Sequence, residues 1–192
     1  MEQIEQAVKI LNNGGIIIFP TDTAFGIGCR SDNETAVCRL FRIRKRPEIK
    51  PTPVLVSSIE MAQKYLLPVP DAVKTKLIKK YWPGALTLIL RCVEKKVPGL
   101  VRGGGDTLGV RMPDHVIALS LINGVRVPIL GPSANFHGGK TPFTLDDLDK
   151  DLVNQVDYVV KGECGVKQVS TIIDCTREPW QILREGAIRI EN

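Results

Sequence analysis

The sequence predicts a single layered α/β domain. Short apolar runs typical of buried strands alternate along the chain with segments whose apolar residues recur at helical spacing. No repeat, low-complexity segment or linker divides the 192 residues, so we expect one domain over residues 1–192. The composition, 43% hydrophobic and 24% charged, is that of a globular protein. No apolar run reaches the ~20 residues that a membrane-spanning helix needs.

The first elements are marked by their boundary residues. Apolar residues at helical spacing predict a helix over residues 3–13, and Gly14–Gly15 ends it. The apolar run 16–19 predicts a short buried strand. Ser31 and Glu34 have the spacing of a capping box, which predicts the start of a second helix at this point.

The rest of the chain repeats this alternation. We expect strands at 53–57, 86–91, 108–111, 127–130, 157–160, 171–174 and 181–183. Helices are predicted to start at Ser58 and Asp114, and a short one lies between Thr144 and Asp147. Strands and helices are therefore interleaved to the end of the sequence.

The positive charge is concentrated in one segment. The formal net charge is only +5, but the cations between positions 39 and 50 face a single acid, Glu48. These cations are Arg39, Arg42, Arg44, Lys45, Arg46 and Lys50. Such a run attracts a polyanion, either the phosphates of a nucleotide or a nucleic-acid backbone. The lysines at 74, 76, 79 and 80 are instead interpreted as the solvated face of a helix.

Cysteine usage and the N-terminus indicate a cytoplasmic protein. The five cysteines include no Cys-x-x-Cys pair, and only His115 and His137 offer imidazoles, so a zinc site is not expected. We expect free thiols in a reducing compartment. Residues 1–5 are acidic and lack the apolar core of a signal peptide.

The familiar phosphate-binding loops are absent. Residues 134–141 approach a P-loop, but Ala134 replaces its first glycine and Pro142 follows directly. Residues 26–31 end in serine where the dinucleotide fingerprint needs glycine or alanine. No Gly-x-Ser-x-Gly elbow occurs. A nucleotide would therefore be held by side chains on loops.

Four loops that follow predicted strands carry the polar groups of interest. In residues 20–26, hydroxyls and a carboxylate either hold the ammonium and hydroxyl of an amino-acid ligand or stabilise a turn. In residues 44–51, Arg44, Arg46 and Lys50 either converge on a triphosphate or complement a helix dipole.

The other two loops also leave two interpretations open. Arg111 ends an apolar strand, where burial requires an anionic partner: a substrate carboxylate or an aspartate of the protein. Ser133 and Asn135 could address one ligand, and Gly131 would let that ligand approach the backbone; otherwise this segment is an ordinary turn.

As a set, ordered motifs from the first helix to the end of the chain resemble the YrdC/TsaC family of L-threonylcarbamoyladenylate synthases. The matching segments are 14–16, Thr21-Asp22-Thr23 with Phe25-Gly26, Arg46-Pro47 with Lys50-Pro51, Trp82-Pro83-Gly84 with Thr87, Gly109-Val110-Arg111 with Pro113, 132–135, 170–174 and 183–188. The resemblance implies a twisted mixed β-sheet with flanking helices and a concave, positively charged face. It also implies the single-domain form of the family.

The resemblance further implies an ATP-using nucleotidyltransferase. It would condense L-threonine, bicarbonate or CO2, and ATP into threonylcarbamoyl-AMP and pyrophosphate, with Mg2+ carried on ATP and no metal site of its own. A downstream threonylcarbamoyl-transferase complex would then modify an adenosine in certain tRNAs.

Site residues are carried over by matching positions. Threonine would be held by Thr23, Arg111, Ser170 and Gly131. ATP would be contacted by Arg46, Lys50, Thr107, Ser133, Asn135, Thr141 and Arg184. The basic motif of Arg44, Arg46 and Lys50 would be catalytic through its charge.

Three positions depart from the family pattern. Arg44 stands where lysine is usual, Leu55 where histidine is frequent, and Gly131 where alanine or serine is common. Leu55 motivates one alternative, a relative with altered amino-acid specificity. The basic run at 39–50 motivates another, a module that binds tRNA or double-stranded RNA.

Overall fold

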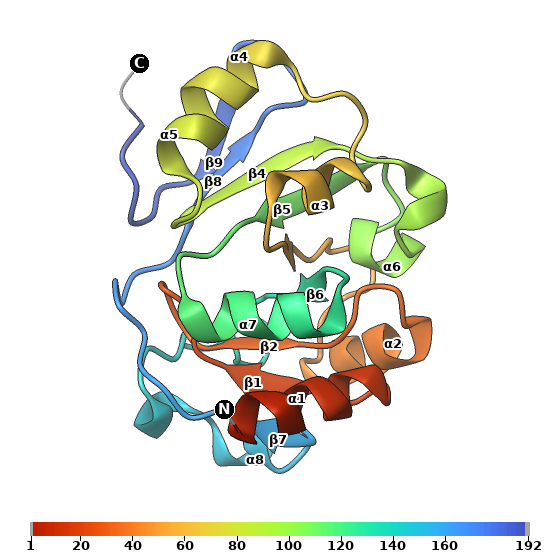
Figure 1. The fold of residues 1–192 in the computed structure, drawn as a ribbon, viewed down its shortest axis with the longest axis vertical. Helices are drawn as coiled ribbons and strands as arrows, with labels where there is room; N and C mark the ends of the chain where they lie inside the picture. The colour runs from red at the N-terminus through yellow and green to blue at the C-terminus, as the bar shows by residue number, and fades with distance from the viewer. Residues whose placement is uncertain (1, 191–192) are drawn as a thin grey trace.

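The computed structural model describes residues 2–190 and divides the strands into two sheets (Figure 1). The smaller sheet has the order β2-β1-β7, with β1 Ile17–Phe19, β2 Gly26–Gly28 and β7 Tyr158–Val159. The larger sheet has the order β6-β3-β5-β4-β8-β9. Its strands are β3 Val54–Leu55, β4 Leu86–Arg91, β5 Thr107–Arg111, β6 Ile129–Leu130, β8 Thr171–Asp174 and β9 Gln181–Arg184.

Helices cover both sheets. They are α1 Glu2–Asn12, α2 Glu34–Ile43, α3 Ile59–Gln63, α4 Asp71–Val73, α5 Lys79–Tyr81, α6 Gly99–Arg102, α7 Val116–Val125 and α8 Lys150–Val153. A π-helical stretch, Lys74–Ile78, joins α4 to α5, and short 3-10 turns lie at Glu94–Lys96 and Leu145–Asp147. In Figure 1, α4 and α5 lie beside β8 and β9, and α7 lies between the two halves of the molecule. None of the helices in residues 2–190 is long and apolar enough to cross a membrane.

Both sheets are mixed. Strand β5 runs parallel to β3 and antiparallel to β4, whereas β4 runs parallel to β8. In the small sheet, β1 is antiparallel to β2 and parallel to β7. The register places Leu55 beside both Arg111 on β5 and Ile129 on β6. These three neighbouring strands thus bring residues that are far apart in sequence side by side.

Alternation along β4 and β5 separates the core from the site. Successive residues of a strand point to opposite faces. Leu86, Leu88, Leu108 and Val110 are buried in the main apolar core, together with Val73 and Leu77 of the helical segment 71–81. The intervening residues, Thr87, Ile89, Thr107, Gly109 and Arg111, line a cavity. Three of these residues, Thr87, Thr107 and Gly109, are small and leave room for a ligand.

The α/β prediction is confirmed, and most predicted elements occur at their predicted positions. The two sheets differ from the single sheet that we expected, and β2, α6 and α8 were not predicted. Two helix starts were also wrong. Helix α2 is capped by Asn33, whose side chain accepts a hydrogen bond from Ala36 N, rather than by Ser31. Helix α7 is capped by His115, whose side chain accepts a hydrogen bond from Ala118 N, rather than by Asp114, which lies one position earlier.

Candidate functional site

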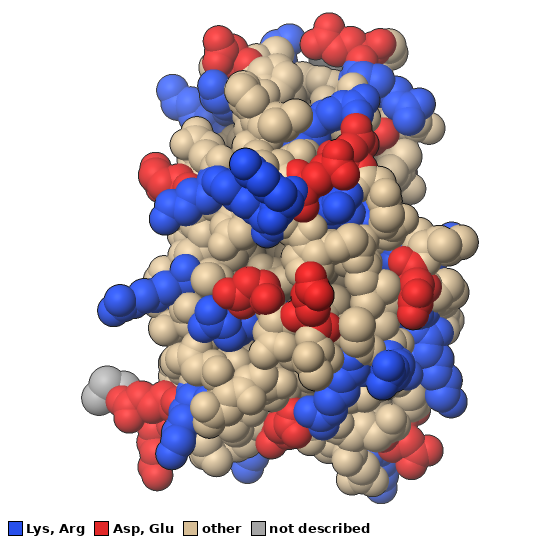
Figure 2. Space-filling model, turned by 90° about the vertical axis from the view of Figure 1, so that its right-hand side faces the viewer, with Lys and Arg blue, Asp and Glu red and all other residues tan. Residues whose placement is uncertain are grey.

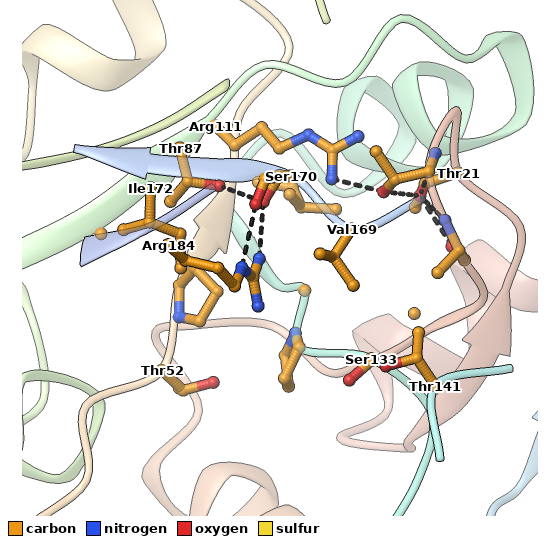
Figure 3. Close-up of a pocket in the computed structure, with 18 of the residues that line it drawn as sticks. Thr21, Thr52, Thr87, Arg111, Ser133, Thr141, Val169, Ser170, Ile172 and Arg184 are labelled. Carbon is orange, nitrogen blue, oxygen red and sulfur yellow. Dashed lines mark hydrogen bonds between the residues drawn. The ribbon is translucent and has the colours of Figure 1, made fainter. Parts of the chain in front are cut away.

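A cavity of about 340 Å³ opens over the face of the large sheet that does not form the core. Its walls come from the loop after β1, the loop after α2, the loop after β6 and residues 169–172. The end of β9 closes it with Leu183 and Arg184. In Figure 3, Ser133 and Thr141 lie together across the cavity from Ser170 and Arg184.

The loop after β1 is a hydroxyl-stabilised turn that also reaches the cavity. Thr21 Oγ1 donates to the Ala24 carbonyl at 2.7 Å and accepts from the N–H groups of Thr23 and Ala24 at 3.2 Å. The Thr23 hydroxyl lies 3.1 Å from Thr21 Oγ1 and lines the cavity. The segment is therefore a stabilised turn, and Thr21 and Thr23 both line the cavity.

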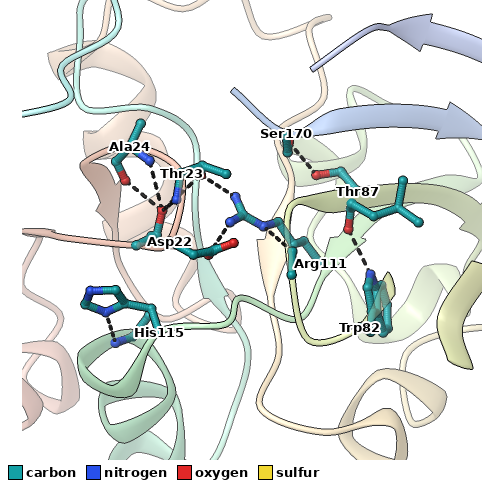
Figure 4. Close-up of polar contacts among 12 residues, drawn as sticks. Asp22, Thr23, Ala24, Trp82, Thr87, Arg111, His115 and Ser170 are labelled. Atoms are coloured by element: carbon teal, nitrogen blue, oxygen red, sulfur yellow. Dashed lines mark hydrogen bonds and ion pairs between the residues drawn. The ribbon is translucent and has the colours of Figure 1, made fainter. Parts of the chain in front are cut away.

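Arg111 is bound from three sides (Figure 4). Its guanidinium forms an ion pair with Asp22, donates from Nη1 to Thr23 Oγ1 at 2.7 Å, and donates from Nε to the Gly84 carbonyl at 3.0 Å. Burial lowers the pKa of Arg111, and the neighbouring Asp22 opposes that shift. The protein thus supplies the anionic partner that the sequence required, and Arg111 still lines the cavity.

Ser170 connects two further lining residues. Its hydroxyl lies 2.9 Å from Thr87 Oγ1 and accepts from Arg184 Nη2 at 2.9 Å. Arg184 Nε also donates to the Ser170 carbonyl at 2.9 Å. Partial burial, followed by the charge of Arg111, lowers the pKa of Arg184. The two arginines are therefore close enough to repel each other, and an anionic ligand between them would relieve that repulsion.

Arg44 is a buried cation without an acidic partner among the described residues. It is 3% exposed, its Nε donates to the Asn135 carbonyl at 3.0 Å, and Nη1 has no hydrogen-bond partner. Burial and, secondarily, the charge of Arg46 lower the pKa of Arg44 to about 10. It remains charged at neutral pH, which is costly without a counter-ion. This arrangement favours an anion in the cavity.

Arg46 lines the cavity, and backbone oxygens hold its guanidinium. Its Nε donates to the Lys50 carbonyl at 3.1 Å and its Nη2 to the Pro51 carbonyl at 2.5 Å. Nη1 lies 3.3 Å from Nδ1 of His137. The carbonyl groups of Lys50 and Pro51 thus fix the orientation of the Arg46 guanidinium before a ligand binds.

The loop after β6 is tied together by Asn135. Its side-chain amide contacts Ser133 and two carbonyl oxygens, those of Phe136 and Gly139. Ser133 lines the cavity, whereas Asn135 is 8% exposed and lies behind it.

The cavity brings together most of the predicted site residues. Ten of them line it: Thr23, Arg44, Arg46, Thr107, Arg111, Gly131, Ser133, Thr141, Ser170 and Arg184. Lys50 and Asn135 do not; Lys50 contributes its carbonyl to Arg46, and Asn135 braces its loop. Leu55 also lines the cavity.

Some lining residues were not singled out from the sequence. Thr52 is buried, and its hydroxyl has no hydrogen-bond partner among the described residues. Nothing local marks it, because it follows Pro51 like an ordinary turn residue. Val169 lies in the middle of the cavity view (Figure 3), in a segment that joins the two sheets and has no periodic pattern.

The cavity lining is positively charged. The described lining residues include four arginines and no carboxylate. Outside it, Arg39 pairs with Asp157 at 2.6 Å, which removes one cation from the basic run at 39–50. Figure 2 shows lysine and arginine interspersed with acidic side chains on the side that carries α2 and α6. The arrangement fits a small polyanion better than a nucleic-acid backbone.

Comparisons with known proteins show the family to which the chain belongs. Residues 9–186 match the family model Sua5/YciO/YrdC, described as telomere recombination. The chain is 36% identical to a threonylcarbamoyl-AMP synthase of Bacillus subtilis, over 98% of this chain and 55% of that protein. It is 31% identical to a threonylcarbamoyl-AMP synthase of Vibrio vulnificus, over 97% of this chain and 100% of that one.

Solved structures show the same arrangement of elements. Sua5 of Pyrococcus abyssi, complexed with L-threonine, superposes with a TM-score of 0.91 at 36% identity, over 95% of this chain and 54% of that one. YciO of Escherichia coli superposes with a TM-score of 0.85 at 29% identity, over 96% and 89%. The chain thus spans about half the length of the Bacillus and Pyrococcus proteins.

Proposed function

Because the chain belongs to the Sua5/YciO/YrdC family, we propose that it is a threonylcarbamoyl-AMP synthase. It would convert L-threonine, bicarbonate or CO2, and ATP into threonylcarbamoyl-AMP and pyrophosphate. The observation that carries this proposal is a single cavity lined by four arginines and several hydroxyls, with no carboxylate among its described lining residues. The cavity suits a ligand that is anionic at both ends, as a threonylcarbamate beside a triphosphate would be.

The threonine end is assigned to Thr23, Arg111 and Ser170. Three of the five N–H groups of the Arg111 guanidinium are used by Asp22, Thr23 and Gly84, which leaves two for a substrate carboxylate. Asp22 and Thr23 both bind this guanidinium, so its orientation is set before a ligand binds. Gly131 also lines the cavity, and we assign its backbone to the same ligand.

The phosphate end is assigned to Arg44, Arg46 and Arg184, with Thr107 and Thr141 as hydroxyl donors. Lys50 does not line the cavity and contributes through its carbonyl, which holds Arg46. Condensation requires a carbamate oxygen of the threonine derivative to attack the α-phosphorus while pyrophosphate leaves. Both reacting groups are anions, so fixed guanidinium groups lower the barrier by neutralising charge and holding the groups in line. The guanidinium of Arg44 lines the cavity and has no acidic partner among the described residues, which makes it the clearest candidate for neutralising phosphate charge.

Magnesium would enter with the substrate. The described residues contain no cluster of three or more histidine, cysteine, aspartate or glutamate side chains that could hold a metal ion. The lining hydroxyls and arginines do not form a cation site either. We therefore assign Mg2+ to the phosphate oxygens of ATP, where it would neutralise charge on the leaving pyrophosphate.

The wider setting follows the same proposal. We assign residues 1–192 to one YrdC-like domain that acts in the cytoplasm and passes its product to a threonylcarbamoyl-transferase complex for tRNA modification. The curated names of the relatives support the synthase activity; the transfer step and any contact with tRNA are extensions of it.

Product analysis with labelled bicarbonate tests the proposal. The purified chain is incubated with Mg-ATP, L-threonine and ¹³C-bicarbonate, and the products are resolved by mass spectrometry. We expect threonylcarbamoyl-AMP that gains one mass unit from the label, and we expect none when Arg44 and Arg46 are both replaced by methionine. An unlabelled adenylate, or none from folded protein, contradicts the assignment.

A further inference from the structure

The side-chain amide of Asn135 has one permitted orientation. Its Nδ2 lies 2.9 Å from the Phe136 carbonyl and 2.7 Å from the Gly139 carbonyl. Both partners are oxygens that only accept hydrogen bonds, so the atom facing them must be the NH2 group, and its two protons are both used. The carbonyl oxygen Oδ1 therefore faces Ser133.

This orientation fixes the proton of Ser133. The Ser133 Oγ lies 2.5 Å from Asn135 Oδ1, which has no proton to donate. The hydrogen bond exists only if the serine O–H is the donor. A hydroxyl carries one proton, so Ser133 has none left for a ligand. What it presents to the cavity that it lines is a pair of acceptor lone pairs.

We propose that Ser133 acts as an acceptor-only residue that recognises a hydrogen-bond donor on the ligand, and that Asn135 is the positioning residue that gives it this polarity. The phosphate and carboxylate groups of the substrates carry no proton at neutral pH, so they are not its partners. The inference rests on the proposed function, whose substrates offer N–H and O–H donors in the adenine amine, the ribose hydroxyls and the threonine nitrogen.

Asn135 connects this acceptor to the anion-binding side of the cavity. Its backbone carbonyl accepts the Arg44 Nε bond at 3.0 Å, while its side chain orients Ser133. Asn135 therefore positions both Arg44, a hydrogen-bond donor for phosphate, and Ser133, an acceptor for a neutral or cationic group. If ATP bound in the reverse orientation, its triphosphate would face the acceptor Ser133 and its nucleoside would face the cation Arg44. Neither contact would be favourable.

The test compares ligands that differ by single donors. Calorimetry gives the dissociation constants of Mg-ATP, 2′-deoxy-ATP, 3′-deoxy-ATP and purine riboside triphosphate, which lacks the adenine amine, and of L-threonine and 3-hydroxybutanoate, which lacks the threonine nitrogen. Native protein is compared with Ser133→Ala, Ser133→Thr and, as a control in the neighbouring position, Thr141→Val. We expect one donor-lacking ligand to bind native protein about tenfold more weakly than its parent. That difference should vanish in Ser133→Ala and persist in Ser133→Thr and Thr141→Val.

The Mg2+ complex of inorganic tripolyphosphate, whose phosphates carry no proton at pH 8.5, supplies the opposite test. Native protein and Ser133→Ala should bind it equally. Weaker binding of tripolyphosphate by Ser133→Ala, or equal losses on every analogue in both proteins, overturns the acceptor assignment. Native protein that discriminates among these ligands yet makes no threonylcarbamoyl-AMP retains the assignment and refutes the proposed reaction. Native protein that binds neither ATP nor threonine refutes both.

Discussion

Leu55 fills the space into which a side chain at position 131 would project. A Cβ atom on Gly131 would lie 2.3 Å from Leu55 Cγ, and 2.7 and 2.8 Å from its two methyl carbons. Leu55 is 1% exposed and belongs to the apolar cluster that contains Ile129 and Leu121, so it has little freedom to move away. Leu55 on β3 therefore requires a glycine at position 131, after β6. The two departures from the family pattern are coupled through this packing.

The coupling predicts non-additive stabilities. Gly131→Ala should destabilise the protein by about 1–3 kcal/mol through overpacking, and Leu55→Ala by about 2–5 kcal/mol through the cavity that it creates. The double variant should be more stable than the sum of these losses implies, because the new methyl group enters the vacated space. Denaturant unfolding of the four proteins measures this, and strictly additive losses would show that the two residues do not share the space.

Replacing Arg44 should raise the stability of the protein and weaken its binding of ATP. Arg44→Met removes a buried guanidinium that has no acidic partner among the described residues, so we expect the free energy of unfolding to rise by about 1 kcal/mol. The same change should weaken ATP binding at least tenfold, since a charge-assisted hydrogen bond contributes about 1.5–3 kcal/mol.

Arg46→Met is the matched control, because Arg46 bonds two backbone carbonyls. It should lose both affinity and stability. A fall in stability of Arg44→Met as large as that of Arg46→Met would mean that Arg44 is mainly structural. Thermal melts with and without Mg-ATP separate the two effects.

Replacing Arg111 should reveal the ion pair with Asp22. Arg111→Met leaves Asp22 buried and unpaired, so we expect a loss of about 3–5 kcal/mol. Adding Asp22→Asn removes the uncompensated charge and should recover much of that stability. Threonine affinity should stay low in both variants, while ATP affinity changes less. A double variant that is no more stable than Arg111→Met contradicts the electrostatic explanation.

Asp147 should make stability depend on pH in the acid range. Its carboxylate accepts from the Thr144 hydroxyl and from the N–H groups of Phe143 and Thr144, and these bonds lower the pKa of Asp147 to about 2. When folding lowers the pKa of a carboxyl group, its ionised form stabilises the fold at pH values above the pKa of the unfolded state. This stabilisation is lost as the pH falls toward the pKa of the folded state. Asp147→Asn should therefore be less stable than native protein at pH 7, with the difference shrinking between about pH 4 and pH 2.

Asp146→Asn controls for the change of net charge, because Asp146 forms no hydrogen bond or ion pair among the described residues. It should match native stability at neutral pH. Chemical unfolding across this pH range measures both variants, and a pH-independent difference for Asp147→Asn would refute the role of its ionised form.

The sequence predicted what depends on local pattern. Strands such as β4 and β8 are apolar runs with clear ends, and the cap of α3 was correct because Ser58 directly precedes its helix and accepts from Met61 N. At α2, Ser31 and Asn33 compete, and spacing alone does not say which side chain meets the free N–H groups.

The rest depended on contacts between distant segments. Residues 26–28 looked like an incomplete nucleotide motif, yet they form β2, and Gly28 is needed because a Cβ would lie 2.1 Å from the Leu130 carbonyl. Likewise, nothing near Arg111 shows that Asp22, 89 positions earlier, is its counter-ion. Residue types marked the site, but only tertiary structure decided which partners are protein and which are left for a ligand.

Pyrophosphate release tests the central claim most directly. Native protein is given Mg-ATP with L-threonine and bicarbonate, and each of the two is omitted in turn under CO2-free conditions. We expect release only when both are present, and its loss when Arg44 and Arg46 are both replaced by methionine in protein that remains folded. Release from ATP alone, or release indifferent to threonine, would contradict the account.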